Sequence, residues 1–441
     1  MIIKKRIITL FIFLSFLISI FTLTSCNVNI SIDNKEEYTF DSLSHEGYTL
    51  DKVVVLSRHN IRSPLSGNGS ALSTITPHEW FNWSSDPSEL SIRGGILENE
   101  MGQYFRKWLE SEGLFTKNYL PNDDEVRIYS NSMQRTISTA KFFTSGLLPL
   151  SNTNIEYHME INKMDPVFTP QFTFMSDSYK EDIIKELNEL FQDDINNLKD
   201  NYSLLEEVID VKDSQDYKSG KFDSFKLDDT NFILEINNEP KITGSLKTAC
   251  SVSDALVLQY YEEADPLKAA FNHKLSLSDW EKIAKIKDVY GDVLFTSPLI
   301  SSHVAHPLLD EINKELTNTN RKFTFLCGHD SNVGSVLSSL NIEPYDLPGA
   351  IEKTTPIGCK VVFSIWKDNN NDSYISIDLV YQTVNQLKEL TILDLNNTPG
   401  IVNIKLKDLA PNNDGLYNYD DVIDRLSESI LKYDQLKEKY L

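Results

Sequence analysis

VVVLSRHNIRSP, residues 53–64, is the stretch that decides the fold. Its first four residues are apolar and three of them are β-branched, which predicts a buried strand of a parallel sheet. The residues after Leu56 then lie at the carboxyl end of that strand, where open α/β sheets usually bind their ligands. Arg58 and Arg62 stay charged at any relevant pH, so at close range they need an anion between them, and phosphate fits their planar donor groups.

His59 lies between these two arginines, which makes it a candidate nucleophile. A neutral imidazole nitrogen attacks phosphorus without first losing a proton, and neighbouring cations offset charge on the transferred oxygens. The alternative is structural: the arginines bind a carboxylate of the protein beside a histidine of the core. A motif this short leaves both interpretations open.

A second apolar run, residues 323–326, also ends in polar residues. It leads into CGHDSN, residues 327–332, and a helix is predicted over residues 333–340. The sequence therefore places His329 and Asp330 at the end of another strand, as it does Arg58 and His59.

A third short apolar run occupies residues 126–130, and Arg135 follows it on a helix predicted over residues 134–145. We expect the ends of the three strands to converge on one anion. A solvated Arg135 on the surface of that helix is the alternative.

The sequence resembles the histidine acid phosphatases, whose signature is an Arg-His-x-x-Arg-x-Pro strand end and a distant His-Asp pair. The similarity extends from about Tyr48 to beyond Tyr381, and within the family it is strongest to the periplasmic glucose-1-phosphatases. The matching segments are Ser57 to Leu65, Asn131 to Phe143, Lys163 to Phe168, Leu256 to Glu262, Leu294 to Pro298, Gly328 to Asn332 and Thr355 to Phe363.

The resemblance implies a role for each residue of the motifs. His59 is expected to form a phosphohistidine, and Asp330 to protonate the leaving alcohol. The same carboxyl group can then activate water against the phosphohistidine, because the first step needs an acid and the second a base. The residues expected to hold the phosphate oxygens are Arg58, Arg62, Arg135 and His329. No cofactor is implied. His303 and His306 are spaced three residues apart, but no cysteine or carboxylate cluster completes a set of metal ligands with them, and both are expected to be exposed.

Two residues bear on the substrate. Asn60 stands where glycine is commoner in the family; asparagine tolerates left-handed backbone, and it also occurs there in glucose-1-phosphatases and some inositol polyphosphate phosphatases. Glu239 matches a segment that faces the substrate in these enzymes, where a carboxylate repels a polyanion and accepts the hydroxyls of a sugar. An ordinary exposed glutamate before a proline is the alternative for Glu239.

Three functions stay open. The expected one is an acid phosphatase that hydrolyses a small-molecule sugar phosphate monoester of the glucose 1-phosphate type. The second keeps the chemistry but takes inositol hexakisphosphate as substrate, which makes the protein a phytase. The third is a non-catalytic surface lipoprotein that binds an anion or a sugar at a vestigial site.

The order of predicted elements indicates an α/β fold: a mixed sheet flanked by helices, interrupted by a smaller, mainly helical domain. Residues 47–164 and 291–441 are assigned to the α/β phosphatase domain, and residues 165–290 to the helical insertion. A small-molecule site is expected in the cleft between the two parts.

The amino terminus predicts export. Three basic residues precede an apolar run that ends before Cys26, which is typical of a lipoprotein signal peptide over residues 1–25. Cys26 is then the lipidated first residue, residues 26–46 form a polar tether, and the mature protein is anchored in a membrane and is periplasmic or on the cell surface. An uncleaved signal anchor is the alternative.

The charge of the chain limits its partners. Removal of residues 1–25 changes the formal net charge from −23 to −26, because it takes away Lys4, Lys5 and Arg6. Such a chain repels nucleic acid and anionic membranes, so no nucleic-acid partner is expected and the lipid is the membrane anchor. The sequence leaves the oligomeric state open.

Overall fold

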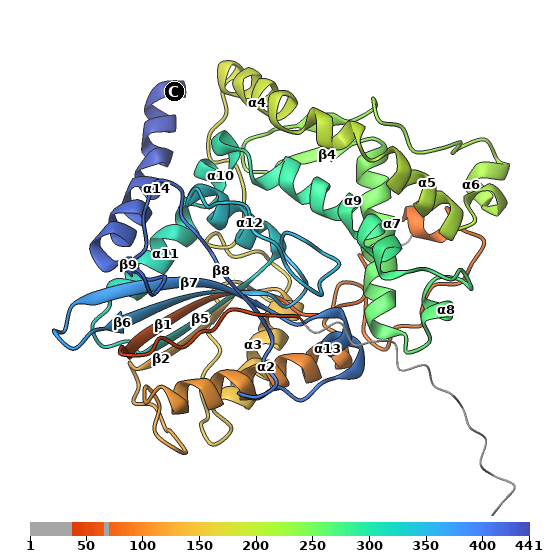
Figure 1. Ribbon diagram of the computed structural model, residues 1–441. Helices are drawn as coiled ribbons and strands as arrows, with labels where there is room; N and C mark the ends of the chain where they lie inside the picture. Colours follow the sequence, from red (N-terminus) through yellow and green to blue (C-terminus); the bar gives the residue numbers. More distant parts are fainter. Residues whose placement is uncertain (1–37, 66–69) are drawn as a thin grey trace, which may run out of the picture. The chain divides into compact units, whose positions relative to one another are not determined.

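Seven strands form one mixed sheet (Figure 1). The computed structural model describes residues 38–65 and 70–441, and Phe40–Leu441 make up a single unit around this sheet. The strand order is β2-β5-β1-β6-β7-β8, and β9 also pairs with β7. The strands are β1 (Thr49–Arg58), β2 (Val126–Ser130), β5 (Phe323–Gly328), β6 (Lys360–Lys367), β7 (Ser373–Tyr381), β8 (Gly400–Asn403) and β9 (Tyr417–Asn418). The chain is therefore an α/β protein, as the sequence predicts.

β1 lies inside the sheet, between β5 and β6. It runs parallel to β5 and antiparallel to β6, while β2 runs parallel to β5 on the other side. Residues 52–58 are buried throughout, as expected for a strand that is covered on both faces. The register pairs Arg58 with Gly328, so His59 and His329 follow at neighbouring positions beyond the ends of these two strands.

Helices cover both faces of the sheet (Figure 1). α2 and α3 pack on one face around Phe105, Phe143 and Phe325, and α11, α12 and α14 pack on the other around Leu309 and Val336. The helices of this part of the chain are α2 (Ile92–Ser111), α3 (Gln134–Leu147), α10 (Pro298–Val304), α11 (His306–Thr317), α12 (Asp330–Ser339), α13 (Val384–Glu389) and α14 (Tyr419–Tyr440).

Two glycines bring α2 and α3 into close contact. A Cβ atom on Gly102 of α2 would lie 2.1 Å from the carbonyl oxygen of Phe143, and one on Gly146 of α3 would lie 2.2 Å from that of Asn99. Real Cβ atoms do not approach oxygen so closely, so the backbones can meet only because both residues lack a side chain. This contact fixes α3, the helix that carries Arg135.

Residues 165–290, predicted as a helical insertion, form mainly helices. Most of their buried apolar residues share one core, which also takes in Ile61 and Leu97 from the part that contains the sheet. Ile183 and Leu187 belong instead to a second core together with Ile300 of α10. The bounds of the predicted domains stay a prediction. The elements of this segment are α4 (Asp177–Asn196), α5 (Lys199–Val208), α6 (Gln215–Lys218), β3 (Asn231–Ile233), β4 (Lys241–Thr243), α7 (Ser245–Glu262), α8 (Pro266–Ala269) and α9 (Leu277–Phe295), with 3₁₀ turns η1 (Ala71–Ser73) outside it and η2 (Val211–Asp213) within it.

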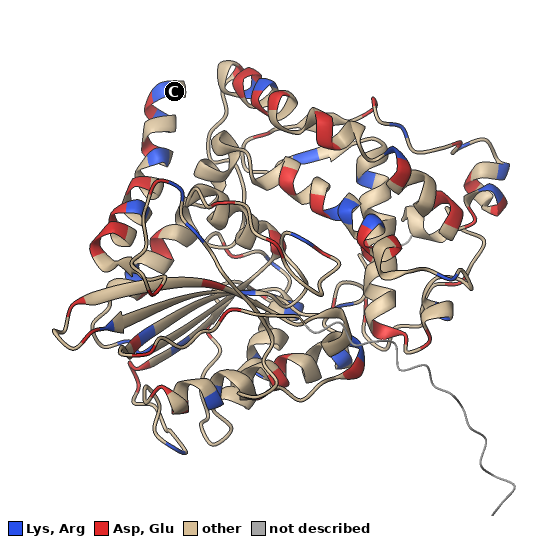
Figure 2. Ribbon diagram, in the orientation of Figure 1, with Lys and Arg blue, Asp and Glu red and all other residues tan. Residues whose placement is uncertain are grey.

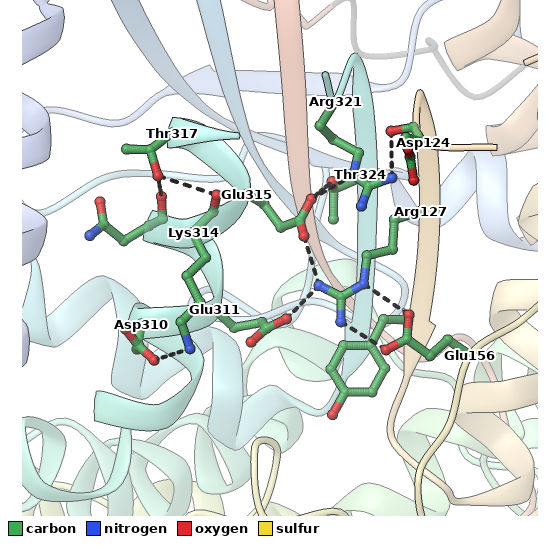
Figure 3. Close-up of polar contacts among 12 residues, drawn as sticks. Asp124, Arg127, Glu156, Asp310, Glu311, Lys314, Glu315, Thr317, Arg321 and Thr324 are labelled. Carbon is green, nitrogen blue, oxygen red and sulfur yellow. Dashed lines mark hydrogen bonds and ion pairs between the residues drawn. The ribbon is translucent and has the colours of Figure 1, made fainter. Parts of the chain in front are cut away.

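Arg127 of β2 ties the edge of the sheet to α11 (Figure 3). Its guanidinium group forms ion pairs with Glu156 at 2.8 Å, with Glu315 at 2.7 Å and with Glu311. Arg321 binds Glu315 from the other side at 2.9 Å. Arg127 lies near the amino end of β2, so this cluster stabilises the edge of the sheet away from the carboxyl ends of the parallel strands.

Charged residues are rare along the strands and frequent on the helices and loops (Figure 2). This distribution agrees with a sheet that is buried on both faces and with the acidic composition of the chain. Within residues 38–65 and 70–441, no helix is both long enough and apolar enough to cross a membrane.

The predicted signal peptide, Cys26 and the tether up to residue 37 lie outside the described residues. The bounds of the tether stay a prediction, but its last residues contact the folded unit. Leu43 is buried in the core beside the sheet, and Asp41 binds β8 through the backbone of Ile401 and Asn403. Apolar residues within a polar stretch pull residues 40–46 onto the folded unit.

His303 and His306 were expected to be exposed, and this prediction is wrong. His303 is fully buried on α10, where its Nε2 accepts the backbone N–H of Thr173 at 2.9 Å. His306 is half-buried, and its ring stacks on Tyr433 with the ring centres 3.6 Å apart. Both imidazoles serve the packing of α14 and its neighbours.

Candidate active site

A cavity of about 500 Å³ opens at the carboxyl ends of β1, β2 and β5. Most of the residues predicted for the site line it: His59, Arg62, Arg135, Glu239, His329 and Asp330. Arg58 is almost completely buried beneath the cavity and contacts Asp330, with Nη2 3.5 Å from Oδ2. The prediction that three strand ends converge on one place is therefore confirmed, and Arg135 faces the cavity rather than solvent.

The ring of His59 is held in one tautomer. Its Nδ1 lies 2.9 Å from the carbonyl oxygen of Asn60, which can only accept a hydrogen bond, so Nδ1 carries the proton. Nε2 is then left with its lone pair. Burial, and next to it the charges of Arg135 and Arg62, hold the pKa of His59 well below its usual value. Both effects favour the neutral imidazole.

Asn60 is itself fixed by a buried ion pair. Its Nδ2 donates to Oε1 of Glu98 at 2.8 Å, and Lys360 binds the same oxygen at 3.0 Å with both charged side chains fully buried. Asn60 does not adopt left-handed backbone. The side chain at this position is thus used for its amide, because the backbone places no demand on a glycine there.

His329 presents an N–H group toward Arg135. Oδ1 of Asn131 accepts two backbone N–H groups, from Ser132 and Asp165, which turns its Nδ2 toward Nε2 of His329 at 2.7 Å. Nε2 is therefore the acceptor and Nδ1 carries the proton. That Nδ1 lies 3.4 Å from Nη2 of Arg135. Two N–H donors cannot bond to each other, so this arrangement suits an anion whose oxygen atoms accept hydrogen bonds from both.

Carboxylates hold two of the arginines. Nη1 of Arg58 donates to Oε1 of Glu352 at 2.8 Å, and Nη2 of Arg62 donates to Oδ2 of Asp254 at 3.0 Å. The Nε atoms of Arg58, Arg62 and Arg135 are buried without a hydrogen-bond partner. Burial, followed by repulsion from Arg62, lowers the pKa of Arg135 to about 10. The arginine cluster is thus incomplete without an anion.

Asp330 is the first residue of α12 and has 38% of its side chain exposed. The predicted helix began three residues later, so the structure places Asp330 at a helix amino terminus, where negative charge is favoured. Burial raises the pKa of Asp330, but Lys287 and then Arg58 outweigh this effect and hold the pKa well below its usual value. The low pKa favours the carboxylate form of Asp330 in the free enzyme.

Glu239 lines the cavity from the loop before β4, in agreement with the placement expected from the resemblance. Burial raises the pKa of Glu239, against the opposing effects of Lys241 and Arg135. Asp292 of α9 lines the cavity as well, and burial together with Asp288 raises its pKa to about 7. The part of the cavity beyond the arginines is therefore lined by carboxyl groups that protonate readily.

Sequence reasoning missed five residues of the site: Glu98, Asn131, Asp254, Lys287 and Glu352. Asn131 was within reach, because it directly follows the third strand. Lys287 also carries a signal: it stands four residues after Ile283 and three before Tyr290, on the apolar side of its helix. Glu98, Asp254 and Glu352 carry none that distinguishes them from the many surface acids of this chain.

The strand ends, the arginine cluster and the His59–Asp330 pair define an α/β phosphatase of the histidine type. The model of the histidine phosphatase superfamily (branch 2) matches residues 49–381. The chain belongs to this family. It is a histidine-type acid phosphatase, a phosphoric monoester hydrolase.

Similar proteins include two glucose-1-phosphatases and a phytase of known structure. The glucose-1-phosphatase of Providencia rettgeri is 37% identical over 378 residues, which cover 84% of this chain and 90% of that protein. The glucose-1-phosphatase of Salmonella typhimurium is 36% identical over 366 residues, covering 82% and 88%. The structure of Hafnia alvei phytase in complex with myo-inositol hexakis sulphate superposes with a TM-score of 0.77 at 26% identity, over 88% of this chain and 98% of that chain.

Proposed function

We propose that the protein hydrolyses a sugar phosphate monoester of the glucose 1-phosphate type through a phosphohistidine at His59. The observation that carries the proposal is the hydrogen bond from Nδ1 of His59 to the carbonyl of Asn60, which leaves the Nε2 lone pair for attack beside the arginine cluster. The similarity to two glucose-1-phosphatases supports this substrate class.

Two displacements at phosphorus complete the reaction. Nε2 of His59 attacks phosphorus, the bond to the sugar oxygen breaks, and Asp330 gives that oxygen a proton. Water then attacks phosphorus while Asp330, now a carboxylate, takes its proton, and the bond to Nε2 breaks to release inorganic phosphate. Arg62, Arg135 and the Nδ1–H of His329 bind the phosphate oxygens in both steps.

The binding of substrate prepares Asp330 for the first step. Before substrate binds, the charges of Lys287 and Arg58 favour the carboxylate form of Asp330. A phosphate dianion brings negative charge beside Asp330 and competes for the field of the same cations, so the pKa of Asp330 rises on binding. The group can then take a proton before the alcohol leaves.

The lining of the cavity supports a substrate with a single phosphate. Beyond the arginines lie the carboxyl groups of Glu239, Asp288 and Asp292, which accept or, when protonated, donate hydrogen bonds to hydroxyl groups. A second phosphate next to these groups meets repulsion that strengthens as water is excluded.

Hydrolysis of an inositol polyphosphate is the second candidate. Lys241 and Lys247 line the same cavity, and their ammonium groups suit additional phosphates. The Escherichia coli phytase AppA is 25% identical over 381 residues, and the Hafnia alvei phytase binds an inositol hexakis sulphate.

The two candidates are tested with purified protein on glucose 1-phosphate, phytate and an aryl phosphate. We expect the highest kcat/KM on glucose 1-phosphate. We also expect a denaturing quench to trap a phosphoenzyme in the wild type that is stable in alkali and labile in acid, as a phosphohistidine is. His59→Ala is expected to fold and to lose turnover and trapping together, because no other nucleophile replaces the imidazole. Turnover in the mutant contradicts the mechanism, and a higher kcat/KM on phytate contradicts the substrate class.

We also propose that the protein is a periplasmic or cell-surface lipoprotein with a lipid on Cys26. The sequence of the first 26 residues supports it. Labelling with a fatty acid in expressing cells should mark the wild type and leave Cys26→Ala unlabelled and released from the membrane fraction. Equal labelling of both contradicts the anchor.

A further inference from the structure

Lys287 connects the helical segment to the acid of the active site. It lies on α9, and only 9% of its side chain is exposed. Its Nζ is 3.2 Å from Oδ2 of Asp330 and 3.0 Å from Oε1 of Glu352. A lysine buried this deeply loses its hydration, so both carboxylates are needed to keep it charged.

The same two carboxylates also bind Arg58. Its Nη1 is 2.8 Å from Oε1 of Glu352, and its Nη2 is 3.5 Å from Oδ2 of Asp330. Asp330, Lys287, Glu352 and Arg58 therefore form a closed ring in which the charges alternate. Two positive and two negative charges cancel, which allows Arg58, Lys287 and Glu352 to be buried while Asp330 lines the cavity.

The ring divides the two oxygens of Asp330 between two tasks. Lys287 and Arg58 both face Oδ2, whereas Oδ1 accepts the backbone N–H of Ser331 at 3.0 Å. A proton on Oδ2 would stand against two cations, so the transferred proton belongs on Oδ1.

We propose that Lys287 is a positioning residue of the phosphatase reaction, which orients Asp330 through Oδ2 and sets the pH range over which it changes between acid and base. The inference rests on the proposed phosphohistidine mechanism. The other charged or titratable groups that act on Asp330 are Arg58 from β1, His59 after it and His329 before α12. Further groups that act on Asp330 are Glu239 from the β3–β4 loop, Arg135 from α3, Cys250 from α7, Tyr290 from α9 and Cys359 before β6. Glu352, from the loop after α12, is connected to Asp330 through Arg58 and Lys287. These groups stay in place when Lys287 is changed.

The sign of the effect follows from the loss of one nearby positive charge. Lys287→Met is expected to raise the pKa of Asp330, because it removes the cation nearest to Oδ2. Hydrolysis of the phosphohistidine needs the carboxylate, so the acid side of the kcat profile moves to higher pH. Protonation of a sugar leaving group needs the acid, so the alkaline side moves up as well. An aryl phosphate, whose leaving oxygen needs little protonation, reports the acid side alone.

The experiment compares pH profiles of kcat for glucose 1-phosphate and an aryl phosphate in four proteins: wild type, Lys287→Met, Lys287→Arg and Lys282→Met. Lys282 is an exposed lysine of the same helix, so its variant removes the same charge outside the ring. We expect Lys287→Met to shift the acid side upward by about one pH unit or more on both substrates. We expect Lys287→Arg and Lys282→Met to keep the profile of the wild type.

A drop in kcat that is equal at every pH, without a shift, overturns the proposal and makes Lys287 a structural residue. The proposal is also overturned if Lys282→Met shifts the profile as much as Lys287→Met, because the shift then does not depend on the position of the charge. Trapping of the phosphoenzyme separates this outcome from failure of the mechanism: if the wild type traps a phosphohistidine but the profiles coincide, only the role of Lys287 is lost. Circular dichroism checks that each variant folds, and Lys287→Arg keeps the test valid if Lys287→Met does not.

Discussion

The carbonyl oxygen of Asn60 accepts the Nδ1–H of His59 before, during and after the proposed reaction. When a phosphoryl group is attached to Nε2 the ring becomes cationic, and a hydrogen bond from a charged donor is stronger than one from a neutral donor. The carbonyl therefore stabilises the intermediate more than the free enzyme. Asn60 can serve in this way because Glu98 fixes its side chain.

Asp330→Asn is expected to slow phosphoenzyme formation from glucose 1-phosphate by about 10²–10⁴-fold, the usual contribution of general acid catalysis. An amide cannot donate a proton to the leaving oxygen, but an aryl ester hardly requires one. Rapid-quench measurement of the first step on both substrates tests this. An equal loss on both would show that Asp330 acts by structure and not as an acid.

Glu239→Gln is expected to lower kcat/KM modestly on glucose 1-phosphate and to raise it on phytate relative to that loss. Removing the carboxylate relieves repulsion of extra phosphates and weakens acceptance of sugar hydroxyls. The ratio of the two kcat/KM values is the measured quantity. Glu235→Gln, an exposed glutamate of the same loop, is the matched control. An unchanged ratio places substrate choice on other residues of the cavity.

At the level of single residues, the sequence predicted what is encoded locally. His59, Arg58 and Asp330 follow apolar runs directly, so their place at strand ends could be foreseen. Glu352 and Lys287 reach the site through the packing of distant elements, and no local pattern announces such a partner. The left-handed backbone considered for Asn60 was unnecessary, because its amide contact with Glu98 depends on a helix elsewhere in the chain.

At the level of elements, length decided what could be predicted. β1, β2, β5, β6 and β7 contain apolar runs long enough to stand out. The short strands β3, β4, β8 and β9 have two to four residues each and show no usable alternation. The helix predicted over residues 333–340 starts three residues earlier, at Asp330, because the first turn of α12 consists of polar residues that carry no apolar pattern.

Gly102→Ala is expected to destabilise the protein by about 1–3 kcal/mol, the usual cost of overpacking. The new methyl group would press on the backbone of Phe143, and α2 would have to move away from α3. Urea unfolding measures the change in free energy. Gly291→Ala is the control: a Cβ there meets nothing within 4 Å, so a helical alanine is expected to be neutral or mildly stabilising. Equal stability of the Gly102 variant and the wild type would contradict the close contact.

At the level of the whole molecule, the buried Asp378 makes stability depend on pH. Burial raises its pKa to about 7, against hydrogen bonds from Asn403 and Ser376. Between these two pKa values the folded protein holds a proton that the unfolded chain, with a carboxyl pKa near 4, has lost. This group's contribution to stability therefore falls as pH rises from about 4 to about 7 and is constant above that range.

Asp378→Asn is expected to remove that dependence. The Tm of Asp378→Asn relative to that of the wild type should therefore increase between pH 5 and pH 8. Over this range the wild type alone has a carboxyl group that is protonated in the folded protein up to about pH 7 and ionised in the unfolded chain. Asp372→Asn, an exposed residue of the turn before β7, is expected to show a constant difference. A constant difference for Asp378→Asn as well would mean that Asp378 is already ionised at pH 5.

The pairing of β1 with β5 also has a consequence for biosynthesis. A ribosome makes Arg58, His59, Arg62 and Arg135 first, and then the whole helical segment before it reaches β5 with His329 and Asp330. A nascent chain therefore holds the nucleophile and most of the phosphate ligands but has neither the acid nor the neighbouring strand that aligns them. The chain can therefore become active only after β5 and α12 have been made and have folded. If the protein is exported as proposed before it folds, phosphate esters in the compartment of synthesis are protected from hydrolysis.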